Sequence, residues 1–94
     1  MTTVRELIDS SEKWTRGTDA RDKLGYSCMF EEAVAVCWCL RGGLQRCYRG
    51  AEFEAASLAM RAACERLYET RNYVLWQDSA KWPQVKRLLD EAGV

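Results

Sequence analysis

The residues of this chain that could do chemistry are first of all its cysteines. Cys37 and Cys39 stand on either side of a tryptophan in the stretch AVCWCLRGGL, residues 35–44. We expect this stretch to be helical, and a helix would turn the two thiols about 160° apart, so that one tetrahedral ion could not bind both. The chain also has no histidine and no CxxC pair. We therefore predict no metal and no cofactor, and interpret the cysteines as small buried hydrophobic residues.

Catalysis is restricted by the same composition. Without histidine, the Ser-His and Cys-His nucleophile pairs and the usual general base at neutral pH are missing. A cysteine activated by a neighbouring cation is the remaining route, and Cys28 is the best candidate because it lies in a predicted loop near charged residues. An unreactive, partly buried thiol is the alternative for Cys28. We predict a protein without catalytic residues.

Arginine, aspartate and tryptophan supply the candidate binding residues. Arg21 stands between Asp19 and Asp22 in the sequence, and this cluster could clamp a ligand or hold the loop in place by ion pairs. Tryptophan occurs four times, more often than a small core needs, and aromatic residues with arginine commonly anchor binding surfaces. For Trp38, a second layer of the core is the alternative. The predicted binding residues are Arg21, Asp22, Trp38, Cys39, Arg41, Trp76 and Asp78.

Helices are the elements expected to position these residues. A capping box of Thr3 with Glu6 begins the first helix, and Gly17 is its expected end. Pro83 suits the first turn of a last helix, with Gly93 just past its end. Between them, hydrophobic periodicity predicts two longer helices at about residues 30–48 and 52–69.

The remaining segments decide the fold class. Residues 17–28 have turn-forming and charged residues but no hydrophobic periodicity, which predicts a loop. Loops of this length often have a functional role. Residues 72–77 fit a strand as well as a helix. The predicted fold is mainly α, a compact single domain (residues 1–94) of about four helices; a small α+β domain with one short hairpin is the alternative, if residues 73–76 pair with the loop. The predicted core is Leu7, Ile8, Val36, Leu40, Leu44, Phe53, Met60, Leu67, Val85, Leu88 and Leu89.

Composition argues against several classes of protein. The 94 residues carry 14 basic and 14 acidic side chains, with no stretch of concentrated positive charge, which argues against a general nucleic-acid binder. No apolar run is long enough to span a bilayer, so we expect no membrane association. The first residues lack the pattern of a secretory signal. Five cysteines, an odd number, then indicate reduced thiols in a cytoplasm.

Three motifs along the chain resemble a known family. They are W-x-x-G-x-x-A-R-D at residues 14–22, W-C-x-x-G-x-L at residues 38–44 and W-x-D at residues 76–78. In this order they resemble an uncharacterised family of short bacteriophage and bacterial proteins, a domain of unknown function. The resemblance implies a phage or prophage gene expressed in the cytoplasm of a bacterial host. The chain departs from the family at Gln77, where asparagine is usual, and at residues 81–83, where relatives are polar and often contain histidine.

Three functional hypotheses follow. The first is a non-enzymatic protein that engages a host or phage protein, for example one of a defence system. The second is a protein that binds or sequesters a small anionic, nucleotide-like ligand, with Arg21, Arg41 or Arg46 for phosphate and Trp38 or Trp76 for stacking. The third is a cysteine-dependent enzyme. In each case we expect a monomer or a homodimer.

Overall fold

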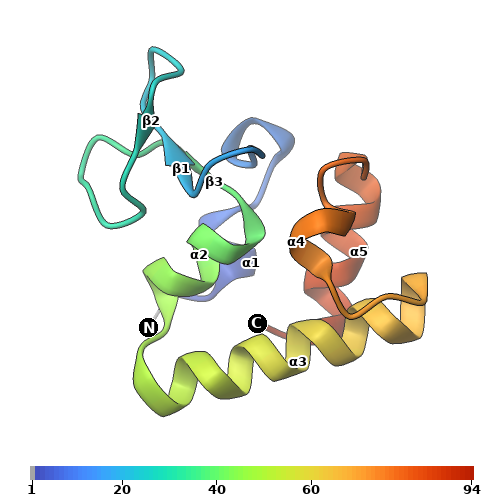
Figure 1. The fold of residues 1–94 in the computed structure, drawn as a ribbon. Coiled ribbons are helices and arrows are strands. Elements are labelled where there is room, and N and C mark those ends of the chain that lie inside the picture. The colour runs from blue at the N-terminus through green and yellow to red at the C-terminus, as the bar shows by residue number, and fades with distance from the viewer. Residues whose placement is uncertain (1) are drawn as a thin grey trace.

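Helix α3 is the longest described element, and α2, α4 and α5 pack on one side of it (Figure 1). The structure is a computed structural model that describes residues 2–94. Helices α3 and α5 pack against each other, α1 packs against α2 and α5, and the short α4 contacts both α2 and α3. None of the described helices is long and apolar enough to cross a membrane. The helices are α1 (Val4–Leu7), α2 (Leu40–Cys47), α3 (Gly50–Tyr68), α4 (Tyr73–Trp76) and α5 (Trp82–Ala92).

A small antiparallel sheet stands beside the helices, at the upper left of Figure 1. Its strands are β1 (Ala20–Arg21), β2 (Ser27–Cys28) and β3 (Cys37–Trp38), in the order β2-β1-β3. Ala20 is the centre of the register, because it pairs with Cys28 on one side and with Trp38 on the other. The sheet leads directly into α2, so it positions the beginning of that helix.

The first helix begins as predicted and ends much earlier. The capping box is confirmed: the Thr3 N–H donates to Glu6 Oε1 at 3.0 Å, and the Glu6 N–H donates to Thr3 Oγ1 at 3.2 Å. The prediction of a helix up to Gly17 is wrong, because α1 ends at Leu7 and a short 3₁₀ turn follows. Aspartate and serines stand directly after α1, and such side chains favour turns over helix interiors. Beyond the turn, the chain is extended and bridges to β3.

The predicted second helix is also wrong over its first ten residues. Residues 30–39 form a loop and β3, and α2 begins only at Leu40. Cys39 caps the helix, since its Sγ accepts the N–H of Gly42 at 3.2 Å. The physical reason is that tryptophan fits a pleated strand well, and pairing of Trp38 with Ala20 decides between the two structures. As a consequence Val36, a predicted core residue, is 46% exposed.

The long loop contains structure that the sequence did not predict. Residues 17–28 supply β1 and β2, which form a short hairpin. The alternative pairing of residues 73–76 with this loop is wrong, because those residues form α4, and Asn72 Oδ1 caps that helix by accepting the Leu75 N–H at 3.1 Å. The mainly helical prediction therefore describes most of the ordered elements, and a small α+β arrangement describes the chain as well.

The last two long helices agree with the sequence. Helix α3 covers the predicted segment, and α5 has Pro83 in its first turn and Gly93 at its C-terminal cap with φ of 71°. Among the predicted core residues, Leu7, Phe53 and Leu67 are only partly buried. The other seven, apart from Val36, are confirmed as buried: Ile8, Leu40, Leu44, Met60, Val85, Leu88 and Leu89.

Candidate functional site

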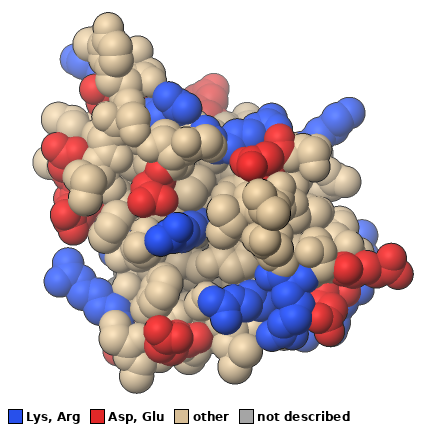
Figure 2. Space-filling model, viewed as in Figure 1, with Lys and Arg blue, Asp and Glu red and all other residues tan. Residues whose placement is uncertain are grey.

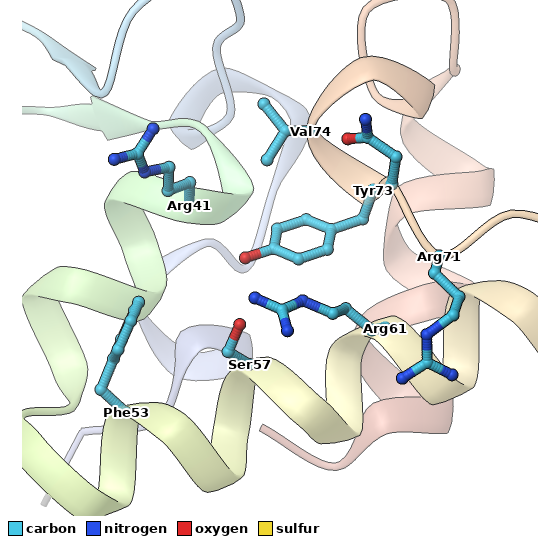
Figure 3. Close-up of a pocket in the computed structure, with 8 residues that line it drawn as sticks. Arg41, Phe53, Ser57, Arg61, Arg71, Tyr73 and Val74 are labelled. Carbon is cyan, nitrogen blue, oxygen red and sulfur yellow. The ribbon is translucent and has the colours of Figure 1, made fainter.

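A hollow of about 550 Å³ opens between α2, α3 and the beginning of α4. We call it the arginine hollow, because three arginines line it: Arg41 from α2, Arg61 from α3 and Arg71 from the segment before α4 (Figure 3). Tyr73 and Ser57 lie at its centre. Three separate segments therefore contribute basic or hydroxyl groups to one cavity.

Helical spacing explains how α3 lines the hollow. Phe53, Ser57 and Arg61 follow one another at intervals of four residues, so their side chains share one face of the helix. Tyr73 reaches the same space from α4, and Figure 3 shows its hydroxyl group between Arg41 on one side and Ser57 with Arg61 on the other. The hollow is thus framed by regular helices, which hold side chains more firmly than loops do.

The positive charge of the hollow is largely uncompensated. In residues 2–94, no carboxylate oxygen lies within 4.0 Å of the guanidinium nitrogens of Arg41 or Arg61. Arg71 differs, because its Nη1 lies 3.5 Å from the carboxylate of Glu65 at the rim. Figure 2 shows basic groups above and below the central hollow. Two guanidinium groups from different helices are therefore free to pair with an anion.

Tyr73 and Ser57 add hydrogen-bonding groups. Tyr73 is 5% exposed and Ser57 is 2% exposed. Burial raises the pKa of the Tyr73 hydroxyl more than its hydrogen bond with Ser57 and the charge of Arg61 lower it. The phenol therefore keeps its proton at neutral pH and can donate a hydrogen bond. Guanidinium and hydroxyl donors around one cavity suit an anion with several acceptor oxygens, such as a phosphate group.

A second hollow of about 250 Å³ adjoins the first. Arg41 and Val74 line both cavities, so the two are neighbours, and we refer to them together as the groove. We call the second part the aspartate hollow, because Asp19 and Asp78 line it, together with Cys39 and residues of the loop before β1. In Figure 2, acidic groups lie on the sheet side of the basic ones. The groove is therefore lined by guanidinium groups in its first part and by two carboxylates beside Arg41 in its second.

Three of the predicted binding residues meet in this groove: Cys39, Arg41 and Asp78. Cys39 is buried, and its Sγ lies 3.9 Å from Asp19 Oδ1. Burial raises the pKa of the Cys39 thiol more than the N–H groups of Gly42 and Arg41 lower it. The sulfur at the beginning of α2 is therefore a capping group in its neutral form, not a thiolate.

Arg21 and Asp22 lie elsewhere and organise the loop. Arg21 donates hydrogen bonds to Thr15 Oγ1 at 3.0 Å, to the Gly25 carbonyl at 3.0 Å and to the Arg16 carbonyl at 3.2 Å. Asp22 Oδ1 accepts the backbone N–H groups of Leu24 and Tyr26 at 2.9 and 3.0 Å. The Arg21 side chain thus holds the loop in place through neutral oxygen atoms, and no ion pair with Asp22 or Asp78 occurs in the described chain.

The predicted tryptophans pack within the fold and do not line the groove. Trp38 is 6% exposed, its Nε1 donates to the Phe30 carbonyl at 3.0 Å, and its ring is part of the hydrophobic core. Arg46 lies over the Trp38 ring, 5.7 Å from its centre. Trp76 stacks on Tyr68 with ring centres 4.5 Å apart.

Gln77 connects three segments beside the groove. It is 2% exposed, and its Oε1 accepts the Leu40 N–H at 3.0 Å and the Trp14 Nε1–H at 3.4 Å. One buried amide thus joins α4 to the first turn of α2 and to the segment before the sheet. Gln77 also lines the aspartate hollow.

Several groove residues were missed by the sequence analysis. Arg61, Arg71, Ser57 and Tyr73 were not predicted, although they form most of the arginine hollow. A usable signal was present in α3, where Ser57 and Arg61 stand four residues apart on a helix rich in alanine. No comparable signal brings Tyr73 to Arg61, because their contact depends on how α4 packs against α3.

Four of the five cysteines have pKa values raised by desolvation: Cys28, Cys39, Cys47 and Cys64. Desolvation, followed by the carboxylates of Glu32 and Asp22, raises the pKa of Cys28, the thiol singled out from the sequence. Burial raises the pKa of Cys47 to about 11. Burial also raises the pKa of Cys64. Within residues 2–94, no group of three or more Cys, Asp and Glu side chains is arranged to hold a metal ion.

Comparison with known proteins gives one match along nearly the whole chain. Searches of curated proteins and of solved structures find no match. A sequence model described as a family of unknown function, DUF6197, matches residues 1–93. The chain therefore belongs to this family of unknown function.

Proposed function

We propose that this protein is a binding protein whose arginine hollow holds a small anionic ligand through a phosphate group. The observation that carries the proposal is that Arg41 and Arg61 line one cavity and that neither has a carboxylate partner within residues 2–94. Arginine binds phosphate oxygens in a bidentate manner, and the protonated Tyr73 hydroxyl offers a further donor. The volume of about 550 Å³ lies in the range of small-molecule sites, about 300–1,000 Å³.

Binding rather than catalysis is the proposed role. Ser57 is the hydroxyl that could attack a bound ligand, but the chain has no histidine to accept its proton. The cysteines with shifted acidity have raised pKa values, which disfavours their thiolates. The groups that face the hollow donate hydrogen bonds and hold charge, and these properties suit retention of an anion.

Thermal unfolding with a panel of phosphorylated compounds tests the proposal. A ligand at about 100 times its Kd stabilises the native state by about 2.7 kcal/mol, which raises the Tm of a domain of this length by roughly 10–20 °C. Arg61→Gln should weaken binding about 10- to 100-fold, since a hydrogen bond to a charged group contributes about 1.5–3 kcal/mol.

Arg66→Gln is the matched control. It lies on the same helix, but its side chain points to α5 and pairs with Glu91 at 3.2 Å. Removing this exposed ion pair costs about 0–1 kcal/mol of stability, and binding should not change. If every phosphorylated compound leaves the Tm unchanged, or if the two arginine variants lose binding equally, the proposal fails.

A second function is favoured by a different part of the surface. We define the tip as residues 22–36, which include the hairpin turn and the loop between β2 and β3. A hollow of about 440 Å³ between residues 22–24 and 33–36 lies on it. Exposed apolar surface of this kind is typical of protein interaction sites. The large apolar side chains that are 46–73% exposed on the tip are Leu24, Tyr26, Met29, Val34 and Val36.

The charge of the tip indicates the partner. The tip has three acidic side chains and one basic side chain, Lys23. The acidic ones are Asp22, Glu31 and Glu32. We propose a protein partner that presents apolar side chains beside lysine or arginine. Both roles are proposed for the cytoplasm of a bacterial cell, with a host or phage protein as the partner, because this is the setting that the resemblance to phage and bacterial proteins implies.

Paired substitutions test the tip. Val34 and Leu58 are both 57% exposed, but Leu58 lies on α3, away from the tip. A partner bound through the tip should be retained by Leu58→Glu and lost by Val34→Glu when each is used to recover proteins from a bacterial lysate. Equal recovery by both variants would contradict this second function.

A further inference from the structure

The aspartate hollow restricts which chemical groups a ligand can carry at the end opposite its phosphate. We infer that the groove takes a phosphomonoester whose other end bears hydroxyl groups, with the phosphate in the arginine hollow and the hydroxyl groups at Asp19 and Asp78. The inference rests on the proposed function, since it assumes that the arginine hollow binds the phosphate. Arg41 and Val74 line both hollows, so one extended molecule can occupy them together.

The carboxylates of the aspartate hollow are available to a ligand. No Lys or Arg nitrogen within residues 2–94 lies within 4.0 Å of the Asp19 or Asp78 carboxylate. The backbone of each is fixed: the Asp19 carbonyl accepts the Cys39 N–H at 3.1 Å, and the Asp78 carbonyl accepts Arg16 Nη1–H at 2.6 Å. The backbone is thus held by other contacts, while the side-chain oxygens have no cationic partner.

The chemistry of a carboxylate defines what it can bind. An ionised aspartate only accepts hydrogen bonds, so its partner must donate. Hydroxyl groups of a sugar meet this requirement. A second phosphate at the same place would be repelled by Asp19 and Asp78, because like charges at short distance destabilise each other. The groove should therefore prefer a monophosphate with a polyol end over a compound with phosphates along its length.

Calorimetric titration with matched probes tests the inference. Ribose 5-phosphate and n-pentyl phosphate carry the same phosphate, but only the first has hydroxyl groups. We expect the wild-type protein to bind ribose 5-phosphate about tenfold more tightly, a difference of about 1.4 kcal/mol. AMP carries its phosphate on the same sugar and adds a base. Its affinity relative to that of ribose 5-phosphate therefore shows whether the groove prefers a nucleotide or a sugar phosphate. ATP should bind more weakly than AMP.

Two variants separate this inference from the proposed function. Asp78→Ala should remove most of the preference for ribose 5-phosphate, and it should leave n-pentyl phosphate binding unchanged or stronger because a repulsive charge is lost. Arg61→Gln should weaken both probes. Asp78 is exposed, so the variant is expected to fold, and Asp19→Ala gives a second measurement at the partly buried position.

The outcomes are distinct. If both probes bind equally and Asp78→Ala changes neither affinity, the inference is overturned while the proposed function stands. If no probe binds, both are overturned. Tight binding of ATP that Asp78→Ala strengthens would also contradict the inference, because it would place phosphates along the whole groove.

Discussion

Gly42 joins the sheet to α2, and its replacement by alanine should destabilise the fold. A Cβ atom at Gly42 would lie 2.0 Å from the carbonyl oxygen of Asp19 and 2.8 Å from its carbonyl carbon. Ordinary contacts of a Cβ atom begin at 3.4 Å. The neighbouring atoms belong to the backbone and cannot rotate away. The loop before β1 and the first turn of α2 would therefore have to separate by more than an ångström.

The expected cost combines a broken hydrogen bond with steric crowding. Separation would break the hydrogen bond from the Cys39 N–H to the Asp19 carbonyl, 3.1 Å long, which contributes about 0.5–1.5 kcal/mol. Overpacking adds about 1–3 kcal/mol. Alanine recovers about 1 kcal/mol through its higher helix propensity. We therefore expect Gly42→Ala to lower the free energy of unfolding by about 2 kcal/mol.

Gly43→Ala is the matched control, because it has the same chemistry one residue later. Its Cβ atom would meet the ends of two side chains, Ile8 Cδ1 at 2.9 Å and Val4 Cγ1 at 3.2 Å, which can shift more easily than backbone. Urea unfolding of both variants, followed by circular dichroism, gives the comparison. If Gly42→Ala is as stable as the wild type, or more stable than Gly43→Ala, the close approach of the two backbones is refuted.

Three further predictions concern the core, the first helix and the thiols. Leu40→Ala should cost about 2–5 kcal/mol in urea unfolding, because Leu40 is 0% exposed; a cost below about half a kcal/mol would contradict its burial. The hydrogen bonds from Thr3 lower the pKa of Glu6 below its ordinary 4.5, so its ionised form stabilises the fold and this contribution is lost as the pH falls through the lowered pKa. Between pH 6 and 3, Glu6→Gln should lose less stability than the wild-type protein. Identical pH profiles of the variant and the wild type would argue against the capping box. Because the pKa of Cys47 is raised to about 11, iodoacetamide should modify it slowly at pH 8, and labelling as fast as in unfolded protein would contradict its burial.

The segments that were predicted correctly depend on local interactions. Three features are specified by residues close to them in the sequence. They are the capping box of Thr3 with Glu6, the helix around Met60 and the helix that contains Pro83. Their hydrophobic residues recur at helical spacing over several turns, and neighbouring elements do not alter that preference. This is why their positions could be read from the sequence alone.

The segments that were predicted wrongly depend on distant partners. Residues 35–39 fit the pattern of a buried helix and that of a buried strand equally well, and pairing of Trp38 with Ala20 decides for the strand. The two strands within residues 17–28 have no signal in the sequence, because two-residue strands have no detectable period. Such short strands form only when three separate segments lie side by side in the folded protein.

The groove could be predicted only in part, because it too depends on contacts between distant segments. Cys39, Arg41 and Asp78 were identified, and they meet in the aspartate hollow. Arg61 and Tyr73 were not, because they converge through the packing of α4 on α3, and no motif links them. Arg21 was predicted as a binding residue because of its charge. Its side chain instead donates hydrogen bonds to oxygen atoms of its own loop.

An NMR titration with ribose 5-phosphate tests the central claim most directly, because it locates binding as well as detecting it. If the arginine hollow holds the phosphate, saturable shifts should appear at Arg41, Arg61 and Tyr73. They should require about 10- to 100-fold more ligand in Arg61→Gln and be unchanged in Arg66→Gln. Residues 22–36 should not respond. The absence of saturable shifts at the arginine hollow, or shifts confined to residues 22–36, would contradict the account.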